Sequence, residues 1–164
     1  MKNNIEKISL LIKNKKFSEA VDTLNNLDEN EKNNPNYYFL KGISYLYLNN
    51  ISAAIENFTQ CLELNSNNPT FYFYRGYTFS RLNDFEKTKE DYQKAISLKP
   101  NAPEFYNNLA GVYYTTGENE KAIENYVKSL ELKKDLKPSL TGLLNVLSQT
   151  KNTNVKNSEI VLAH

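Results

Sequence analysis

The strongest constraint on the fold is a repeat of 34 residues that runs from Pro35 to Leu136. Written in rows of that length, the chain aligns three times without a gap, and the rows begin at Pro35, Pro69 and Pro103. Large apolar residues and small residues then fall into shared columns: Tyr38/Tyr72/Tyr106, Gly42/Gly76/Ala110, Tyr45/Phe79/Tyr113, Ala54/Thr88/Ala122, Phe58/Tyr92/Tyr126, Cys61/Ala95/Ser129 and Leu64/Leu98/Leu132. A period of this length is typical of arrays in which each unit packs on its neighbours.

Each row is expected to form two helices joined by a tight turn. The first helix begins at the proline of its row, because proline costs no hydrogen bond at the first helical position, and Asn34 and Asn68 are good N-cap residues before it. The third row keeps its proline but has Ala102 in place of the cap. We expect the first helices to end near Asn49, Asn83 and Gly117, which tolerate the left-handed conformation that reverses the chain.

Gly42 and Gly76 lie in the middle of the predicted first helices, where a glycine costs about 1 kcal/mol relative to alanine. A glycine is favoured at such a place when the second helix of the repeat approaches closely. Ala110 occupies the same column in the third row, so a methyl group is the largest side chain that this contact admits.

The order of aromatic, small and aliphatic positions resembles the tetratricopeptide repeat (TPR), in which every repeat is an antiparallel pair of helices. The resemblance implies an all-α fold, an α-solenoid of helix pairs in a right-handed TPR superhelix with a C-terminal capping helix. It places repeats at residues 35–68, 69–102 and 103–136, after a degenerate repeat at 1–34. Residues 137–149 are expected to form the capping helix. Residues 150–164, largely polar and without periodicity, are expected to be a disordered tail.

The two ends of the array keep only part of the pattern. In the degenerate repeat the second helix is recognisable and the first retains only its apolar spacing, as expected where one face has no neighbour. The second-helix columns are occupied by Phe17, Ala20, Leu24 and Leu27. In the capping helix, one face carries Leu140, Leu143, Leu144 and Leu147.

Composition excludes several classes of partner. The net charge is +1 and the pI about 7.7, so no overall field attracts nucleic acid or acidic lipid. The lysines of the first 16 residues are interpreted as a solvated helix face. No apolar run approaches the ~20 residues of a membrane span, and Lys7 interrupts any signal-peptide core. We therefore expect a cytoplasmic protein that binds neither nucleic acid nor membrane.

The sequence offers no convincing catalytic or metal-binding group. Cys61 is the single cysteine, and it lies in a column otherwise filled by Ala95 and Ser129, which indicates a buried structural thiol. The single histidine is the last residue, His164, and no Gly-rich phosphate loop is present. We expect a protein that is not an enzyme and needs no cofactor or metal.

The residues expected to bind a partner come from the first helices. Phe39, Ile43 and Leu46 share a face next to the one that carries Gly42, and this face is expected to remain as an apolar stripe. In TPR proteins the first helices line the concave surface, which implies a groove for an extended or helical peptide. The residues assigned to it are Phe39, Ile43, Tyr47, Phe73, Tyr74, Tyr77, Arg81, Asn107, Asn108 and Tyr114.

One known TPR subclass does not match. Chaperone-binding TPR domains hold a C-terminal carboxylate with a clamp of lysine, asparagine and arginine at fixed positions. The corresponding residues here are Phe39, Ile43, Tyr74, Glu104 and Asn108. Starting one repeat earlier gives Ile5, Ser9, Leu40, Thr70 and Tyr74. Neither set resembles the clamp, so such chaperone tails are not expected as partners.

Three functional readings stay open at this point. The first is a monomeric adaptor that binds a segment of another protein. The second is an N-terminal targeting module of a larger enzyme, since TPR arrays often precede transferase or oxygenase domains. The third is self-assembly through the exposed end of the stack.

Overall fold

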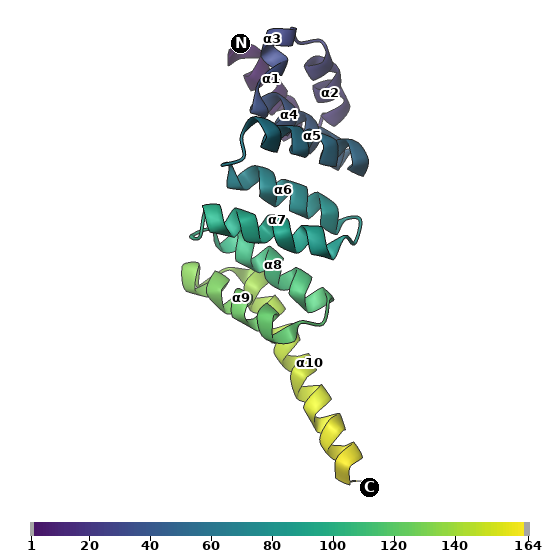
Figure 1. The fold of residues 1–164 in the computed structure, drawn as a ribbon, viewed down its shortest axis with the longest axis vertical. Coiled ribbons are helices and arrows are strands. Elements are labelled where there is room, and N and C mark those ends of the chain that lie inside the picture. Colours follow the sequence, from purple (N-terminus) through teal and green to yellow (C-terminus); the bar gives the residue numbers. More distant parts are fainter. Residues whose placement is uncertain (1, 163–164) are drawn as a thin grey trace. The chain divides into compact units, whose positions relative to one another are not determined.

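The computed structural model describes the backbone of residues 2–162 and the side chains of residues 4–151. Over this range the chain forms ten helices and no strand, which confirms the all-α prediction (Figure 1). The helices group into two compact units, residues 1–98 and 99–164, and each unit is built from antiparallel helix pairs. None of the helices described is both long and apolar enough to cross a membrane.

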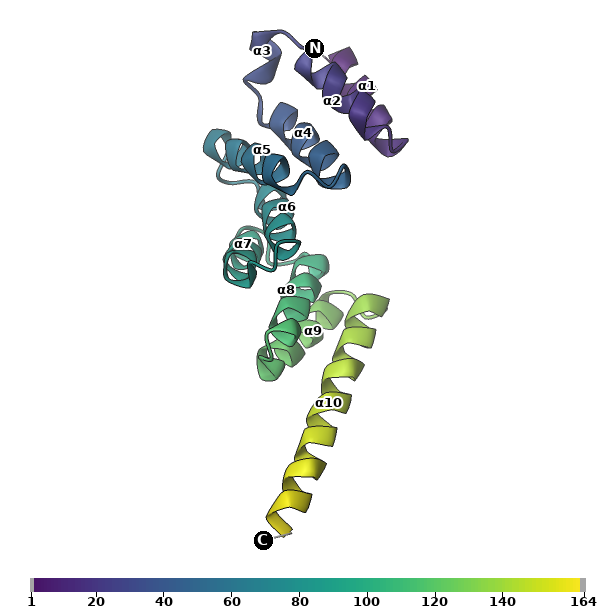
Figure 2. The same cartoon turned by 90° about the vertical axis from the view of Figure 1, so that its right-hand side faces the viewer.

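The first unit contains seven helices, α1 to α7. The degenerate repeat supplies α1 (Lys2–Lys13) and α2 (Phe17–Asn25), followed by a single turn of helix, α3 (Glu29–Lys32), that the sequence did not indicate. The next two pairs are α4 (Pro35–Tyr47) with α5 (Ile51–Leu64), and α6 (Pro69–Ser80) with α7 (Phe85–Leu98). Both α1 and α2 contact α4, and the three helices lie together in both views (Figures 1 and 2).

The second unit contains α8 (Pro103–Thr115), α9 (Asn119–Leu132) and α10 (Lys137–Leu162). Its helix pair, α8 with α9, is followed by α10, which packs on both and then runs past their ends (Figure 2).

The predicted starts of the first helices in the three strong repeats are confirmed. Pro35, Pro69 and Pro103 are the first residues of α4, α6 and α8. Asn34 caps α4 by accepting a hydrogen bond of 2.9 Å from the backbone N–H of Asn36, and Asn68 caps α6 in the same way. Ala102 makes no such bond.

The turns inside the repeats also follow the prediction. Asn49, Asn83 and Gly117 have φ values of 60°, 58° and 79°, the left-handed conformation expected for them. Lys15 has φ 59° at the equivalent place in the degenerate repeat, although lysine rarely adopts this conformation.

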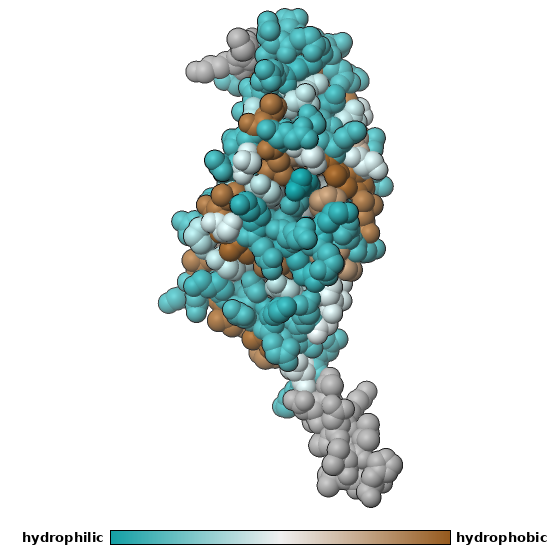
Figure 3. All heavy atoms as spheres, in the orientation of Figure 1, coloured by the Kyte–Doolittle hydropathy of each residue, from teal (hydrophilic) through white to brown (hydrophobic). Residues whose placement is uncertain are grey.

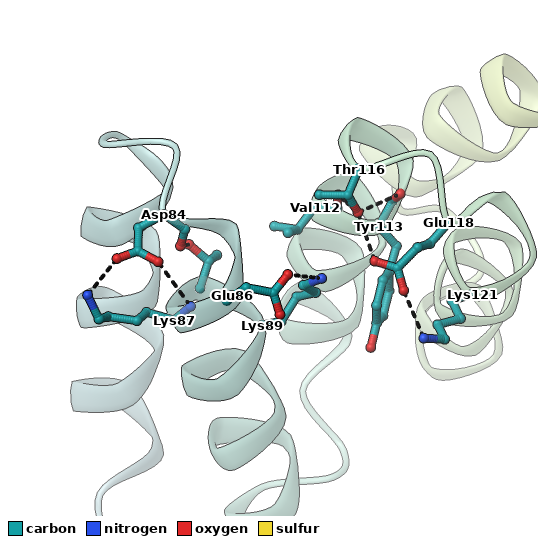
Figure 4. A network of polar contacts seen from close by, with 10 residues as sticks. Asp84, Glu86, Lys87, Lys89, Val112, Tyr113, Thr116, Glu118 and Lys121 are labelled. Atoms are coloured by element: carbon teal, nitrogen blue, oxygen red, sulfur yellow. Dashed lines mark hydrogen bonds and ion pairs between the residues drawn. The ribbon is translucent and has the colours of Figure 1, made fainter.

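An acidic residue pairs with a lysine at the start of two second helices, α7 and α9 (Figure 4). In the first unit Asp84 accepts hydrogen bonds from the side chain of Lys87, at 2.7 Å, and from the backbone N–H of the same residue. The Lys87 side chain lowers the pKa of Asp84. In the second unit Glu118 pairs with Lys121 at 2.8 Å and accepts a hydrogen bond from Thr116. An acidic residue followed three positions later by lysine suits the positive end of a helix dipole.

The centre of the pairs α4–α5 and α6–α7 is a contact between a glycine on the first helix and an aromatic ring on the second. A Cβ atom on Gly42 would lie 2.7 Å from a ring carbon of Phe58, and one on Gly76 would lie 3.0 Å from the ring of Tyr92. Both rings are fully or almost fully buried, and so is Ala110 of the third pair. The close approach predicted from the glycine column is therefore confirmed.

A buried ion pair fixes α6 on α7. Two nitrogens of the Arg75 guanidinium, Nε and Nη2, each donate to one carboxylate oxygen of Asp91 at 2.8 Å. Asp91 is buried, and its hydrogen bond raises the pKa of Arg75 further. A bidentate pair of this kind fixes the relative orientation of its two side chains as well as stabilising their contact. It therefore helps to fix the rotation of α6, and with it the directions in which the other side chains of α6 point.

The apolar stripe predicted on α4 is not left exposed. Ile43 and Leu46 are only 7% and 4% exposed, and they pack with Ala54 and Phe58. The reason is that other helices cover this face, with Ile12 of α1 and Tyr74 of α6 packed against it.

The helix α10 differs from its prediction in two ways. It continues to Leu162 instead of ending at 149, and residues 150–162, expected to be disordered, are helical, since neither glycine nor proline follows Gly142 up to that point. His164 and Ala163 lie outside the described residues. Its buried face is also different from the leucine face that the sequence suggested.

Ser139, Gly142 and Val146 pack inward on α10, whereas Leu144 is 65% exposed and both Leu140 and Leu147 are exposed as well. The ring of Tyr126 explains this choice, because a Cβ atom on Gly142 would lie only 2.3 Å from its Cζ. The helix presents the residue without a side chain to that ring, and Leu140, Leu144 and Leu147 are turned away, while Leu143 is half-buried.

Overpacking of the glycine column should cost stability. Replacing Gly76 by leucine forces a side chain against Tyr92 and Asp91, and we expect the free energy of unfolding to fall by about 2 kcal/mol. Thermal and urea unfolding followed by circular dichroism would measure this. The control is Gly111→Ala on α8, where a Cβ atom would meet only the Tyr126 hydroxyl at 3.8 Å. That variant should keep or gain stability, by up to about 1 kcal/mol. An unchanged melting temperature for Gly76→Leu would contradict the packing described.

Candidate functional site

A hollow of the first unit lies between α1, α2, α4 and α6 and has a volume of about 590 Å³. It is open to solvent and mostly apolar. We call it the aromatic hollow, and it is lined by Ser9, Ile12, Lys13, Lys15, Phe17, Phe39, Leu40, Ile43, Tyr47 and Tyr74. Hollows of this size, apolar with a few polar groups at the edge, are the usual form of a binding site.

Four aromatic side chains, those of Phe17, Phe39, Tyr47 and Tyr74, line the hollow. Tyr47 is 64% exposed, yet its ring stacks on Phe17 with centroids 4.7 Å apart and planes 7° from parallel. Phe39 meets Tyr74 edge-on, with centroids 5.3 Å apart. Partial burial raises the pKa of Tyr74, so its hydroxyl stays protonated and can donate a hydrogen bond.

These rings are held by the core beneath them. Phe39 also contacts Phe58 and Phe71, at 6.0 and 5.4 Å between centroids, and Tyr74 contacts Phe58 at 5.9 Å. Because Phe58 and Phe71 are buried, the two wall residues have little freedom to move. A partner would therefore meet a preformed surface, which lowers the entropic cost of binding.

The hollow brings together four of the predicted groove residues, namely Phe39, Ile43, Tyr47 and Tyr74. Ile43 contributes to the floor, since it is almost fully buried. Tyr47 is the most exposed of the four.

Three other predicted residues of the first unit do not line the hollow. Phe73 stacks on the buried ring of Tyr92, with centroids 5.4 Å apart, so its contact is with its own helix pair. Tyr77 is exposed on α6. Arg81 follows the end of that helix and donates from Nη2 to the side-chain oxygen of Asn49 at 3.1 Å.

The remaining predicted residues belong to α8 in the second unit. Asn107 accepts a hydrogen bond of 2.9 Å from Ser139, whose hydroxyl lies 2.8 Å from that of Ser129, so this side chain helps to attach α10. Asn108 donates to the backbone oxygen of Glu104 in its own helix. Tyr114 is half-buried.

The sequence reasoning missed the contribution of the degenerate repeat. Ile43, Leu46 and Tyr47 are the ninth, twelfth and thirteenth residues of the repeat that begins at Pro35. The same positions in residues 1–34 are Ser9, Ile12 and Lys13, and all three line the hollow. The repeat register could therefore have identified them, but groove residues were assigned in the three strong repeats only.

Cys61 has the structural role that its column suggested. The thiol is fully buried and donates to the backbone oxygen of Pro35 at 3.3 Å, and Ser129 makes the same bond to Pro103 in the second unit. Burial raises the pKa of Cys61 to about 12. Within the range the structure describes, no three histidine, cysteine or acidic side chains are close enough together to hold a metal ion.

Fold and hollow together define a helix-pair repeat protein with an open aromatic surface. Family models described as tetratricopeptide repeat match residues 35–68 and 103–136, and one described as TPR repeat matches residues 81–117. Together they cover more than half of the 164 residues. The chain therefore belongs to the tetratricopeptide repeat family.

Solved structures support the same fold. The MamA fragment from residue 41 to the end, from Desulfovibrio magneticus RS-1, is 18% identical, with a TM-score of 0.83 over 98% of this chain and 90% of that one. The first TPR of Spaghetti (RPAP3), bound to an HSP90 peptide, is 20% identical, with a TM-score of 0.69 over 71% of this chain and 93% of that one. The Sgt2 TPR domain from Aspergillus fumigatus is 21% identical, with a TM-score of 0.69 over 73% and 81%. A comparison with curated protein sequences gave no match.

The burial of Cys61 can be tested by its reactivity. We expect Ellman's reagent to detect no thiol in the native protein between about pH 7 and pH 9, because a pKa of about 12 keeps the group protonated and the chain covers it. In guanidinium chloride the same reagent should detect one thiol per chain. Rapid labelling of the native protein would show that the α4–α5 pair opens far more readily than its packing implies.

Proposed function

We propose that this protein is a non-catalytic adaptor that binds a segment of another protein in the aromatic hollow. The observation that carries the proposal is Tyr47, a large ring that is 64% exposed at the edge of a preformed apolar hollow. Exposed aromatic side chains beside a pocket are typical anchors of protein interfaces.

The lining of the hollow supports this assignment. Figure 3 shows one face of the molecule, on which hydrophilic side chains predominate and the hydrophobic surface is broken into separate groups. The hollow differs from such surface because Phe17, Phe39, Tyr47 and Tyr74 line it together. Family membership is in line with the proposal, since one related fold is solved with a bound peptide. The TPR fold is in general an interaction module, which also fits a cytoplasmic adaptor without an activity of its own.

The alternative, a targeting module attached to a transferase or oxygenase domain, would use the same surface. The adaptor and the targeting module differ in the proteins that they would capture. An adaptor connects a client protein to a separate effector, whereas a targeting module serves the enzyme domain to which it is attached. The identity of the crosslinked partner distinguishes them.

The proposal is tested by capture from a lysate of the source cells followed by crosslinking mass spectrometry. The wild type is compared with Tyr47→Ser, which removes the exposed ring. The matched control is Leu82→Ser, which removes a 53% exposed apolar side chain outside the hollow. Circular dichroism verifies that both variants are folded.

We expect a partner that crosslinks to lysines of α1 and of the turn after it, and that is reduced at least about fivefold by Tyr47→Ser, the loss of a central anchor worth more than 1 kcal/mol. The control should bind as the wild type does. Partners that Tyr47→Ser retains in full, or crosslinks confined to α7, α9 or α10, would contradict binding in the hollow.

A further inference from the structure

The edge of the aromatic hollow is positively charged. Lys13 ends α1 and Lys15 lies in the turn that follows, and both are exposed. Neither takes part in an ion pair among the residues described, and no aspartate or glutamate lines the hollow. Two ammonium groups thus stand beside four aromatic rings without a counter-charge.

Lys15 occupies a position where the fold favours other residues. Its φ of 59° is left-handed, and the equivalent positions in the three other repeats hold Asn49, Asn83 and Gly117. Asparagine and glycine tolerate this conformation far better than lysine does. A lysine here costs stability, and local strain of this kind is found preferentially at functional sites.

The next residue departs from the local rule as well. Lys16 is the N-cap of α2, where Asn50, Asp84 and Glu118 stand in the other repeats, and it makes no capping hydrogen bond. Its order of charges is opposite to that of α7 and α9, since Lys16 pairs with Glu19 at 2.9 Å, whereas Asp84 pairs with Lys87 and Glu118 with Lys121. Glu19 therefore offsets the charge of Lys16, and Lys13 and Lys15 remain as the lysines of the hollow outside an ion pair among the residues described.

We propose that the occupant of the aromatic hollow is an acidic peptide segment, with an aromatic or aliphatic side chain next to one or more carboxylates. This deepens the proposed function and rests on it. The apolar side chain would enter between Phe39, Tyr47 and Tyr74, and the carboxylates would meet Lys13 and Lys15 at the edge. The positive charges come from Lys13 and Lys15, which are not clamp positions, whereas the clamp positions that line this hollow, Phe39, Ile43 and Tyr74, carry no charge.

The small number of lysines at the hollow favours an acidic peptide over single-stranded nucleic acid, which also binds to aromatic rings combined with positive charge. A nucleic acid needs a basic track along its backbone. The hollow offers two unpaired lysines in one place, and the whole chain has a net charge of +1.

The inference is tested by selecting a random dodecapeptide display library on the wild-type protein. We expect the enriched peptides to combine an aromatic or aliphatic residue with an excess of aspartate and glutamate over the input library. A fluorescein-labelled consensus peptide then serves as the probe for fluorescence anisotropy. Its affinity should fall as sodium chloride is raised from about 0.05 to about 0.5 M, because exposed charges are screened.

Three variants test whether the lysines of the hollow bind the acidic residues of the probe. Lys13→Gln and Lys15→Asn should each weaken binding of the probe roughly two- to fivefold, the range of an exposed ion pair. The control Lys94→Gln removes the same charge from α7, away from the hollow, and should leave the affinity unchanged. Lys15→Asn introduces the residue found in two of the other repeats, so its melting temperature should equal or exceed that of the wild type, and lost binding cannot be ascribed to unfolding.

Several outcomes would overturn the inference. Enriched peptides without excess acidic residues, or full binding by the Lys13→Gln/Lys15→Asn double variant, would reject the acidic occupant. If those peptides still depended on Tyr47, the proposed function would stand. Failure to enrich any peptide, or tighter binding of poly(U) RNA than of the probe, would also reject it. Loss of the captured partner in Tyr47→Ser tests the adaptor function independently of these charges.

Discussion

The contact on which the rest of the structure depends is that between a glycine of the first helix and a buried aromatic ring of the second, in the pairs α4–α5 and α6–α7. Phe58 against Gly42 and Tyr92 against Gly76 leave no room for a larger side chain. Since these rings are buried completely or nearly so, the contact fixes the distance and rotation of the two helices in each pair. In the second unit the ring of Tyr126 even selects the face of α10, through Gly142.

The candidate site is a consequence of that packing. Once Gly42 has turned one face of α4 toward α5, the neighbouring face meets α1, α2 and α6, which cover Ile43 and Leu46 but leave Tyr47 in solvent. Phe39 and Tyr74 rest on the buried ring of Phe58, so the wall of the hollow is an extension of the core. The lysines at its edge, Lys13 and Lys15, come from the degenerate repeat. In that repeat two successive residues, Lys15 and Lys16, replace the residues that suit the turn and the helix start in the other repeats.

Particular residues show why part of this arrangement could be predicted. The prolines that begin α4, α6 and α8 and the left-handed turns at Asn49, Asn83 and Gly117 depend on the local preferences of single residues. Those preferences can be read without knowing what lies nearby. The residues of the site were predicted less well. Phe73, Ile43 and Tyr47 were all assigned to the groove from the same repeat pattern, but the pattern does not say which of them another helix covers, and their burial depends on that. The turn after α1 was overlooked because Lys15 is an unusual residue for its conformation.

The sequence by itself determined the all-α class, the 34-residue register, the helix starts and the family, since a periodic pattern encodes which residues pair within each repeat. Only the tertiary structure decided which apolar residues remain exposed. It placed Lys13, Phe17 and Tyr47 around one hollow, and it turned Leu140, Leu144 and Leu147 of α10 outward. Exposure depends on neighbours from distant parts of the chain, and the contact of Tyr126 with Gly142, like the cover of α4 by α1 and α6, arises only after the helices have packed.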